Sequence, residues 1–147
     1  MRIAFDLDNT LIRCGYDFPS EKPQRRFLVK LLGNEPLREG IKELADYCHQ
    51  RGWEMWVYTT SYRSAWRIRR LFWLHGIGLD GVVNQQRHDR EVKARCTKHP
   101  PSFGIDLLID DSAGVRMEGE RHGFRVLVVA PEDARWAEKV RAALESS

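Results

Sequence analysis

The chain has few cysteines, and their positions match no common disulfide or metal-binding pattern. Only three occur among its 147 residues, at Cys14, Cys48 and Cys96. None forms a Cys-x-x-Cys pair, and Cys96 with His99 lacks the two further ligands that a structural zinc site needs. Because free thiols are the default state in a reducing compartment, we expect three free cysteines and no zinc site.

Long apolar runs are also absent. No run approaches the ~20 residues of a membrane-spanning helix, so we expect no membrane segment. An apolar run that ends in acidic residues already begins at residue 3, which leaves no room for a signal peptide. The sequence therefore predicts a cytoplasmic protein.

The chain carries no large excess of either charge, since its formal net charge is only +3. Basic residues nevertheless cluster at Arg63, Arg67, Arg69 and Arg70. We interpret this cluster as the solvated face of a helix. A surface for phosphate groups or nucleic acid is the alternative that the sequence leaves open.

Length and patterning favour one domain over residues 1–147, because helical and strand patterns alternate as in an α/β protein with a parallel sheet. We expect strands at 3–8, 54–60, 81–84, 105–109 and 124–130. Helices are expected at 36–51, at 61–76 with Ser61 as N-cap, and from Asp133 onward. Residues 13–33 are interpreted as a loop with one short helix, and residues 85–101 show no clear pattern.

Small oxygen-bearing side chains follow three of these expected strands. They form the pairs Asp6 and Asp8, Thr59 and Thr60, and Asp110 and Asp111. Ligands of open parallel sheets bind beyond the carboxyl ends of the strands, so we expect these pairs to share one edge. Neighbouring carboxylates repel each other, and a divalent cation relieves that repulsion. The pattern predicts a metal-dependent phosphate site.

The order of these motifs resembles the haloacid dehalogenase (HAD) superfamily. The matching segments are Asp6-Leu7-Asp8-Asn9-Thr10-Leu11, Val57-Tyr58-Thr59-Thr60 and Leu108-Ile109-Asp110-Asp111-Ser112. The resemblance implies a three-layer, Rossmann-like parallel sheet of about five strands, with helices on both faces. It also implies phosphoryl transfer, with Asp6 as the nucleophile that forms an aspartyl phosphate and Asp8 as the general acid and base. Dehalogenases of this superfamily lack the second aspartate, so Asp8 favours phosphate chemistry.

The resemblance further implies a Mg²⁺ ion held by Asp6, Asp110 and the backbone carbonyl of Asp8. Asp111 would be either a further ligand or a residue that contacts a ligand. Such an ion would neutralise both the nucleophile and the phosphoryl group. Donors for the phosphoryl oxygens are expected from the Thr59 hydroxyl, the Thr60 backbone N–H and a lysine. Lys98 and Lys93 both precede Asp110 at suitable distances. We prefer Lys98, because the prolines in its Lys-His-Pro-Pro run could fix its approach to the sheet.

Neither gap between the motifs is long enough for a full cap domain. About fifty residues separate Thr10 from Thr59, and about forty separate Thr60 from Pro101. Residues 13–33 could form a small flap only. An open site of this kind favours a bulky or macromolecular phosphorylated substrate, or a small substrate completed by another subunit.

Other proteins with clustered aspartates fit less well. A calcium-binding EF-hand loop would require glycine and glutamate where the chain has Leu11 and Asp17. A receiver domain places its phosphorylated aspartate after a middle strand, where this chain has no isolated candidate. A P-loop protein is excluded because no Gly-x-x-x-x-Gly-Lys-Ser/Thr loop is present. The leading hypothesis is a Mg²⁺-dependent phosphatase. A phosphotransferase of the same chemistry and a catalytically idle binding protein on this fold remain the alternatives.

Overall fold

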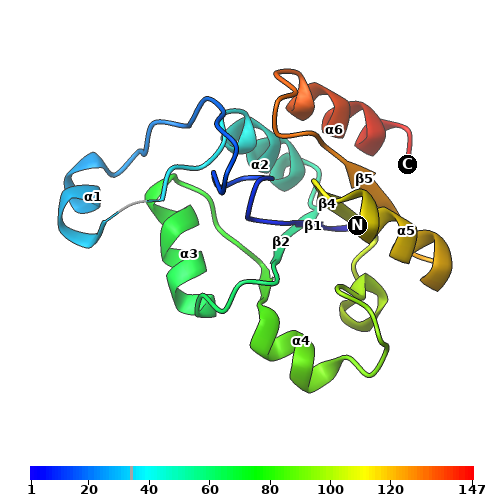
Figure 1. The fold of residues 1–147 in the computed structure, drawn as a ribbon. Coiled ribbons are helices and arrows are strands. Elements are labelled where there is room, and N and C mark those ends of the chain that lie inside the picture. Colours follow the sequence, from blue (N-terminus) through cyan, green and yellow to red (C-terminus); the bar gives the residue numbers. More distant parts are fainter. Residues whose placement is uncertain (34) are drawn as a thin grey trace.

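Five short parallel strands form the centre of the protein in the computed structural model, which describes residues 1–33 and 35–147 (Figure 1). The strands are β1 (Arg2–Phe5), β2 (Glu54–Tyr58), β3 (Gly81–Val83), β4 (Leu107–Asp110) and β5 (Val126–Val128). Their order in the sheet is β3-β2-β1-β4-β5. The chain therefore runs outward from β1 to β3 and resumes at β4 on the other side of β1. This order places the topological switch point between β1 and β4.

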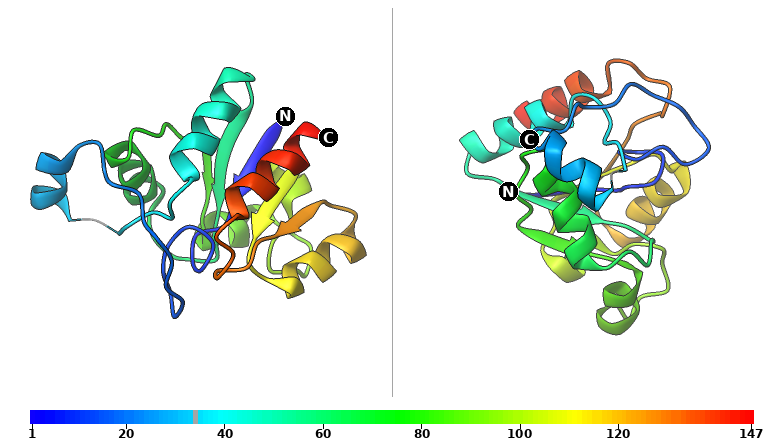
Figure 2. Two further views of the ribbon diagram at one scale, coloured as in Figure 1. Left: turned by 90° about the horizontal axis from the view of Figure 1, so that it is seen from above. Right: turned by 90° about the vertical axis from the view of Figure 1, so that its left-hand side faces the viewer.

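Helices cover both faces of the sheet, as Figure 2 shows from two directions. Side chains of α2 (Ile41–Gln50), α3 (Ala65–Leu74) and α6 (Trp136–Glu145) pack with Ile3 and Phe5 in the core on one face. On the other face, Ala4 packs with a second core that includes residues from α5 (Ala113–His122) and the 3₁₀ turn Pro100–Phe103. Successive strand residues point to opposite faces, so β1 contributes to both cores. The predicted three-layer α/β architecture is confirmed.

The helix α1 (Arg26–Leu32) differs from the others, because none of its residues is buried. It projects at one end of the molecule, beside α3 (Figures 1 and 2). The backbone N–H of Arg25 donates to the carbonyl of Leu74 at 3.2 Å and so joins the start of α1 to the end of α3. This short helix falls within the predicted flap of residues 13–33. A role for that segment as a flap stays a prediction.

The first two predicted helices begin at other residues than expected. The helix predicted over residues 36–51 begins at Ile41, because Leu37 and Arg38 instead form β-bridges with Ile12 and Ser20. Ser64 caps α3 by accepting from the N–H of Arg67 at 3.1 Å, so the prediction of Ser61 as the cap was wrong.

Two helices were not predicted. These are α4 (Gln85–Glu91) and α5. The helix α5 buries only Val115 and Gly119, which leaves almost no apolar periodicity to detect. None of the helices among the described residues is both long enough and apolar enough to span a membrane.

Candidate active site

A tight turn after β1 separates Asp6 from Asp8. The N–H of Asp6 still donates to the carbonyl of Ile109 in β4, at 2.9 Å. The carbonyl of Leu7 then accepts from three successive N–H groups, those of residues 10, 11 and 12. Asn9 adopts a left-handed conformation with φ of 62°, which asparagine tolerates better than most residues. Asp6 therefore stays within the sheet edge, whereas Asp8 lies beyond it in the turn.

Asp6 and Asp110 share one buried lysine. The Nζ atom of Lys98 lies 2.6 Å from Oδ1 of Asp6 and 2.6 Å from Oδ2 of Asp110. Only 2% of Lys98 is exposed to solvent. Since Asp6 follows β1 and Asp110 ends β4, the lysine joins the two strands at the switch point of the sheet. Charge-assisted hydrogen bonds this short are among the strongest polar contacts in proteins.

Burial and charge together shift the pKa values of this cluster. Burial raises the pKa of Asp6 to about 7; the neighbouring charge of Asp110 also raises it, and Lys98 opposes the shift. Burial likewise raises the pKa of Asp111, with a further contribution from Asp110. Burial acts to lower the pKa of Lys98, but the two carboxylates outweigh it and the net shift is upward. The lysine is therefore fully charged at neutral pH.

Three carboxylates at this edge could hold a metal ion. Oxygen atoms of Asp6, Asp110 and Asp111 all lie within 4.8 Å of one another. The Thr10 hydroxyl lies between two of them, 3.1 Å from Asp6 and 3.2 Å from Asp111. Three carboxylates beside one lysine leave an excess of negative charge, and hard oxygen ligands of this kind suit Mg²⁺. The residues present therefore fit the predicted ion.

The carboxylate of Asp8 does not belong to that metal-binding group but pairs with an arginine. One Arg63 nitrogen lies 3.2 and 3.4 Å from the two Asp8 oxygens and 2.9 Å from the Ser61 hydroxyl. The same guanidinium donates to both carboxylate oxygens of Glu35, at 3.0 and 2.8 Å. Glu35 and Asp8 thus hold Arg63 from two sides. Sequence reasoning placed Arg63 on a solvated helix face, and its contact with Asp8 had no local signal.

The loop before β4 explains how Lys98 reaches the sheet edge. Glu118 of α5 accepts from the N–H and the hydroxyl of Thr97, at 2.9 and 2.8 Å. The N–H of His99 donates to the Tyr58 hydroxyl at 2.9 Å. The 3₁₀ turn that starts at Pro100 follows directly. Lys93, the other candidate of the sequence analysis, is exposed.

The two threonines after β2 occupy different environments. Thr59 is 1% exposed, and its hydroxyl accepts from the N–H of Ser61 at 3.0 Å. Thr60 is exposed. Because β2 pairs directly with β1, with Val57 opposite Phe5, Thr59 follows its strand at the edge where Asp6 follows β1. Their predicted contacts with a phosphoryl group stay predictions.

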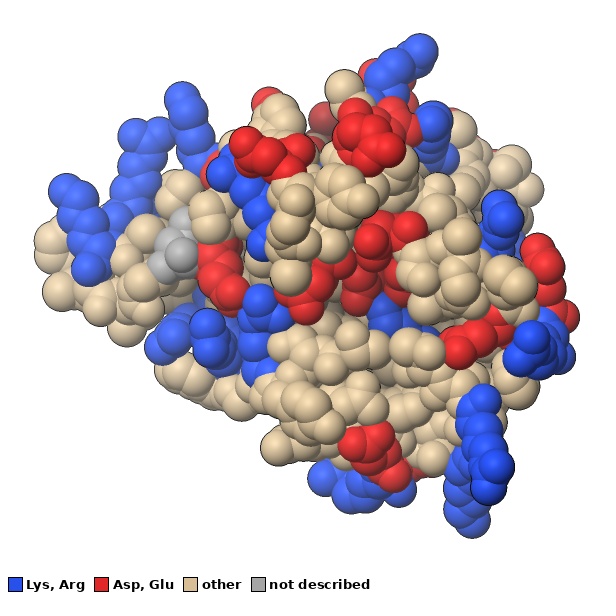
Figure 3. All heavy atoms as spheres, viewed as in Figure 1, with Lys and Arg blue, Asp and Glu red and all other residues tan. Residues whose placement is uncertain are grey.

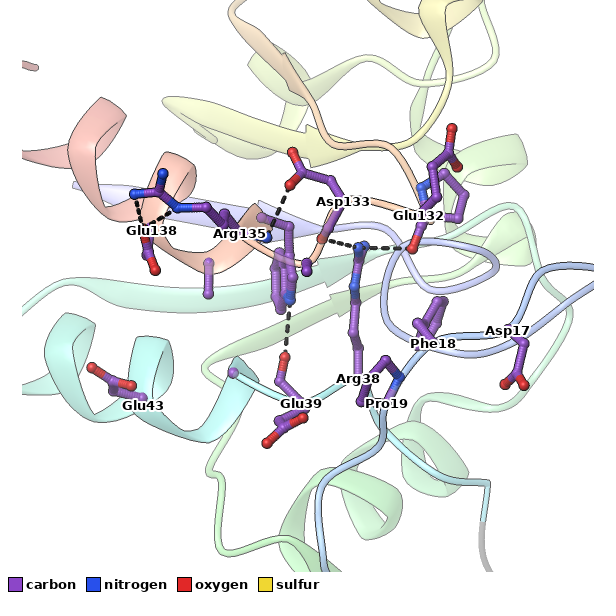
Figure 4. A pocket seen from close by; sticks show the side chains of 15 residues that line it. Asp17, Phe18, Pro19, Arg38, Glu39, Glu43, Glu132, Asp133, Arg135 and Glu138 are labelled. Carbon is purple, nitrogen blue, oxygen red and sulfur yellow. Dashed lines mark hydrogen bonds and ion pairs between the residues drawn. The ribbon is translucent and has the colours of Figure 1, made fainter.

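Arg38 is a buried residue that the sequence analysis did not single out. Its guanidinium donates to the carbonyls of residues 130, 131 and 133 at 2.9 to 3.0 Å, and to that of Thr10 at 3.3 Å. It lies 4.8 Å from the ring centroids of both Phe18 and Trp136. It lines a surface hollow of about 330 Å³. Figure 4 shows its side chain among the other residues of this hollow. Arg38 thus ties the turn after β1 to the loop after β5.

Solved structures that resemble this one include a HAD-superfamily hydrolase, a putative beta-phosphoglucomutase and a further hydrolase. A HAD-superfamily hydrolase, subfamily IA, from Geobacter sulfurreducens PCA has a TM-score of 0.60 and 16% identity over 97% of this chain and 95% of its own. A putative beta-phosphoglucomutase from Thermotoga maritima has a TM-score of 0.56 and 15% identity, covering 96% and 98%. A hydrolase from Streptococcus pneumoniae TIGR4 has a TM-score of 0.61 and 13% identity, covering 98% and 97%.

No family model and no curated protein matches the chain. Sequence identities this low show a shared fold. The chain therefore has the fold of the HAD-superfamily hydrolases, as the order of its motifs predicted. The candidate site lies at the carboxyl edge of the sheet, where proteins with open parallel sheets bind their ligands.

Proposed function

We propose that the protein is a Mg²⁺-dependent phosphatase that hydrolyses a phosphate monoester through a phosphoaspartate at Asp6. The observation that supports this most directly is the pair of 2.6 Å contacts from Lys98 to Asp6 and Asp110. The buried ammonium group of Lys98 lies between two aspartates, with a third carboxylate close by. This arrangement suits the binding of a phosphoryl group beside a metal ion.

In the first step, a carboxylate oxygen of Asp6 attacks the phosphorus atom and the bond to the leaving oxygen breaks. Asp8 then donates its proton to the leaving oxygen, so that a neutral alcohol departs. The position of Asp8 supports this role, because it lies in the turn beyond Asp6 and outside the carboxylate cluster. Lys98 neutralises negative charge that develops on the phosphoryl oxygens.

In the second step, Asp8 takes a proton from a water molecule, whose oxygen attacks the phosphorus atom. The bond between phosphorus and Asp6 breaks, and inorganic phosphate leaves. Mg²⁺ held by Asp6, Asp110 and Asp111 would supply positive charge against the repulsion between a carboxylate and a phosphoryl dianion. Thr59 and the N–H of Thr60 would donate to the remaining phosphoryl oxygens.

Transfer of the phosphoryl group to an alcohol is the second candidate. The Thermotoga maritima neighbour, described as a putative beta-phosphoglucomutase, favours it. The two functions differ only in the acceptor of the second step. Products formed in the presence of excess glycerol or a sugar separate them: hydrolysis yields inorganic phosphate alone, whereas transfer yields a new phosphate ester.

The experiment that tests the proposal is turnover of p-nitrophenyl phosphate and a panel of sugar, nucleotide and protein phosphates, with and without Mg²⁺. We expect Mg²⁺-dependent release of phosphate that the substitution Asp6→Asn abolishes. Asp46→Asn, which changes an exposed carboxylate on α2, is the matched control and should retain full activity. Turnover by Asp6→Asn equal to that of the unaltered protein, or no turnover on any substrate, would contradict the proposal.

A further inference from the structure

The outward face of α3 carries two tryptophans and two arginines. Arg69, Arg70 and Trp73 lie three, four and seven residues after Trp66, and these helical spacings bring all four to one face. The opposite face holds Ile68, Leu71 and Phe72, which are part of the core. Trp66 is 68% exposed and Trp73 is 44% exposed. Large indole rings this open to water are unusual, since tryptophan is mostly buried in folded proteins.

The two indole rings line a shallow hollow of about 450 Å³ together with residues 77–79. Arg70 lies 4.9 Å from the ring centroid of Trp66, and Arg25 lies 4.0 Å from that of Trp73. Each ring is therefore held on one side by an arginine and is still exposed to water. This arrangement combines flat apolar surfaces with fixed positive charge.

A line of arginines connects this face to the candidate active site. Arg63, which contacts Asp8, precedes the N-cap of α3, and Arg67 and Arg70 follow it at four and seven residues. Within α3, Arg67 and Arg70 are three residues apart, and neighbours at that spacing lie about 5–6 Å apart on a helix surface. The ten residues of α3 include three arginines and no acidic residue. Glu35, the nearby acid, is already engaged by Arg63 and Arg67. Figure 3 shows basic side chains gathered over α1 and α3.

We propose that the substrate is single-stranded nucleic acid with a terminal phosphate, and that the strand lies along α3. This inference rests on the proposed function. The terminal phosphate monoester occupies the Asp6 site, the following phosphates contact Arg67 and Arg70, and bases stack on Trp66 and Trp73. Exposed aromatic rings beside a basic track are how proteins bind single strands of any sequence. An acidic peptide would satisfy the arginines but has no bases for the indole rings to stack on.

Binding of a fluorescently labelled oligothymidylate, followed by anisotropy, tests the surface itself. The double substitution Trp66→Ala/Trp73→Ala should weaken binding about tenfold or more, because each stacked base contributes substantially. Arg70→Gln should make the logarithmic salt dependence shallower by about 0.7, the value for one phosphate contact on a single strand. Met117→Ala/Arg121→Gln removes an exposed apolar residue and an arginine from α5 and is the matched control. Thermal unfolding of each variant checks that it is folded.

Hydrolysis tests the substrate assignment. Oligonucleotides with a 5′-phosphate, a 3′-phosphate or no terminal phosphate are compared with a mononucleotide, a phosphopeptide and p-nitrophenyl phosphate. DNA and RNA versions of each oligonucleotide show which of the two nucleic acids is the better substrate. We expect at least one oligonucleotide phosphate to exceed the mononucleotide about tenfold in kcat/KM. The double tryptophan variant should lose that advantage and keep its turnover of the aryl phosphate.

The outcomes separate this inference from the proposed function. Unchanged oligonucleotide binding in the double variant, equal hydrolysis of mononucleotide and oligonucleotide, or preference for the phosphopeptide overturns the inference while the phosphatase stands. No turnover of any phosphate, with oligonucleotide binding that still depends on Trp66 and Trp73, contradicts the phosphatase and overturns the assignment of a substrate.

Discussion

Asp6 and Asp8 are the same residue type, two positions apart, in very different surroundings. The side chain of Asp6 is 8% exposed and contacts a buried lysine, whereas that of Asp8 is 34% exposed and contacts Arg63. Burial raises the pKa of Asp6 to about 7. Oxygens of Asp6, Asp110 and Asp111 lie within 4.8 Å of one another, and the carboxylate of Asp8 is outside that group.

The difference between the two aspartates shows how one turn can assign two roles. A nucleophile beside a metal ion needs a fixed position away from bulk water, and an acid or base needs access to the leaving group and to water. The left-handed conformation at Asn9 lies between the two residues and lets the backbone turn away from the sheet. The contrast between the two sites can be tested by changing each separately.

Apart from loss of the nucleophile itself, the largest effect is expected from Asp8→Asn, which removes the proposed acid and base. Loss of such a group lowers turnover about 10²- to 10⁴-fold. A p-nitrophenolate leaving group needs no proton, so the variant should still form the phosphoaspartate on Asp6 and then hydrolyse it slowly. Rapid mixing should show a burst of nitrophenolate from the aryl phosphate and no burst of alcohol from an alkyl phosphate. No burst with either substrate would mean that Asp8→Asn does not slow hydrolysis of the phosphoaspartate relative to its formation.

The next largest effect is expected from Lys98→Met. It leaves Asp6 and Asp110 buried without their shared cation, and breaking a buried ion pair in this way costs about 3–5 kcal/mol. Urea unfolding should show that loss in the absence of Mg²⁺ and a partial recovery when Mg²⁺ is added. Lys93→Met changes an exposed lysine of the same loop and should leave the unfolding free energy nearly unchanged. Equal losses in both variants would contradict a special role for Lys98.

A moderate effect is expected from pH. Because the pKa of Asp6 is raised to about 7, a proton competes with Mg²⁺ below that pH. Mg²⁺ affinity measured by calorimetry should fall by up to about tenfold for each pH unit below 7 and level off above it. Asp6→Asn should remove this dependence.

The same shift sets the stability of the metal-free protein. The folded state keeps a proton on Asp6 up to about pH 7, and the unfolded chain loses it near the ordinary value of 3.8. The stabilising contribution is therefore present at low pH and is lost as pH rises through 7. Lys98 is charged in both states over this range and does not change the sign. Unfolding in urea with EDTA, from pH 5 to 8, measures the trend.

The smallest effect is expected from Glu35→Gln. This change keeps the shape of the residue but removes the charge that holds Arg63 beside Asp8. We expect a several-fold change in turnover of an alkyl phosphate and a displaced pH profile, because Arg63 would then interact with Asp8 alone. Glu43→Gln, at a glutamate whose side chain is 82% exposed, is the control. An unchanged profile would show that Asp8 acts independently of the segment around Glu35.

Much of the fold could be predicted from the sequence because its signals are local. Buried strands appear as short apolar runs, and the face of α2 appears as Ile41, Leu44 and Cys48 at helical spacing. The helix α5 escaped notice because a helix with two buried positions leaves almost no periodic signal. The start of α2 was misplaced because Leu37 and Arg38 pair with Ile12 and Ser20, and that pairing has no local pattern.

Sequence patterns alone predict the order of the five strands, the aspartate and threonine pairs that follow three of them, and the kind of chemistry these residues could perform. Each of these depends on residues close together in the chain. The folded structure was needed to show that Lys98 joins Asp6 to Asp110, that Arg63 pairs with Asp8 and Glu35, and that Arg38 is buried. These contacts join residues between 12 and 95 positions apart. Such residues meet only after the loops have packed against the completed sheet, so no local pattern in the sequence records them.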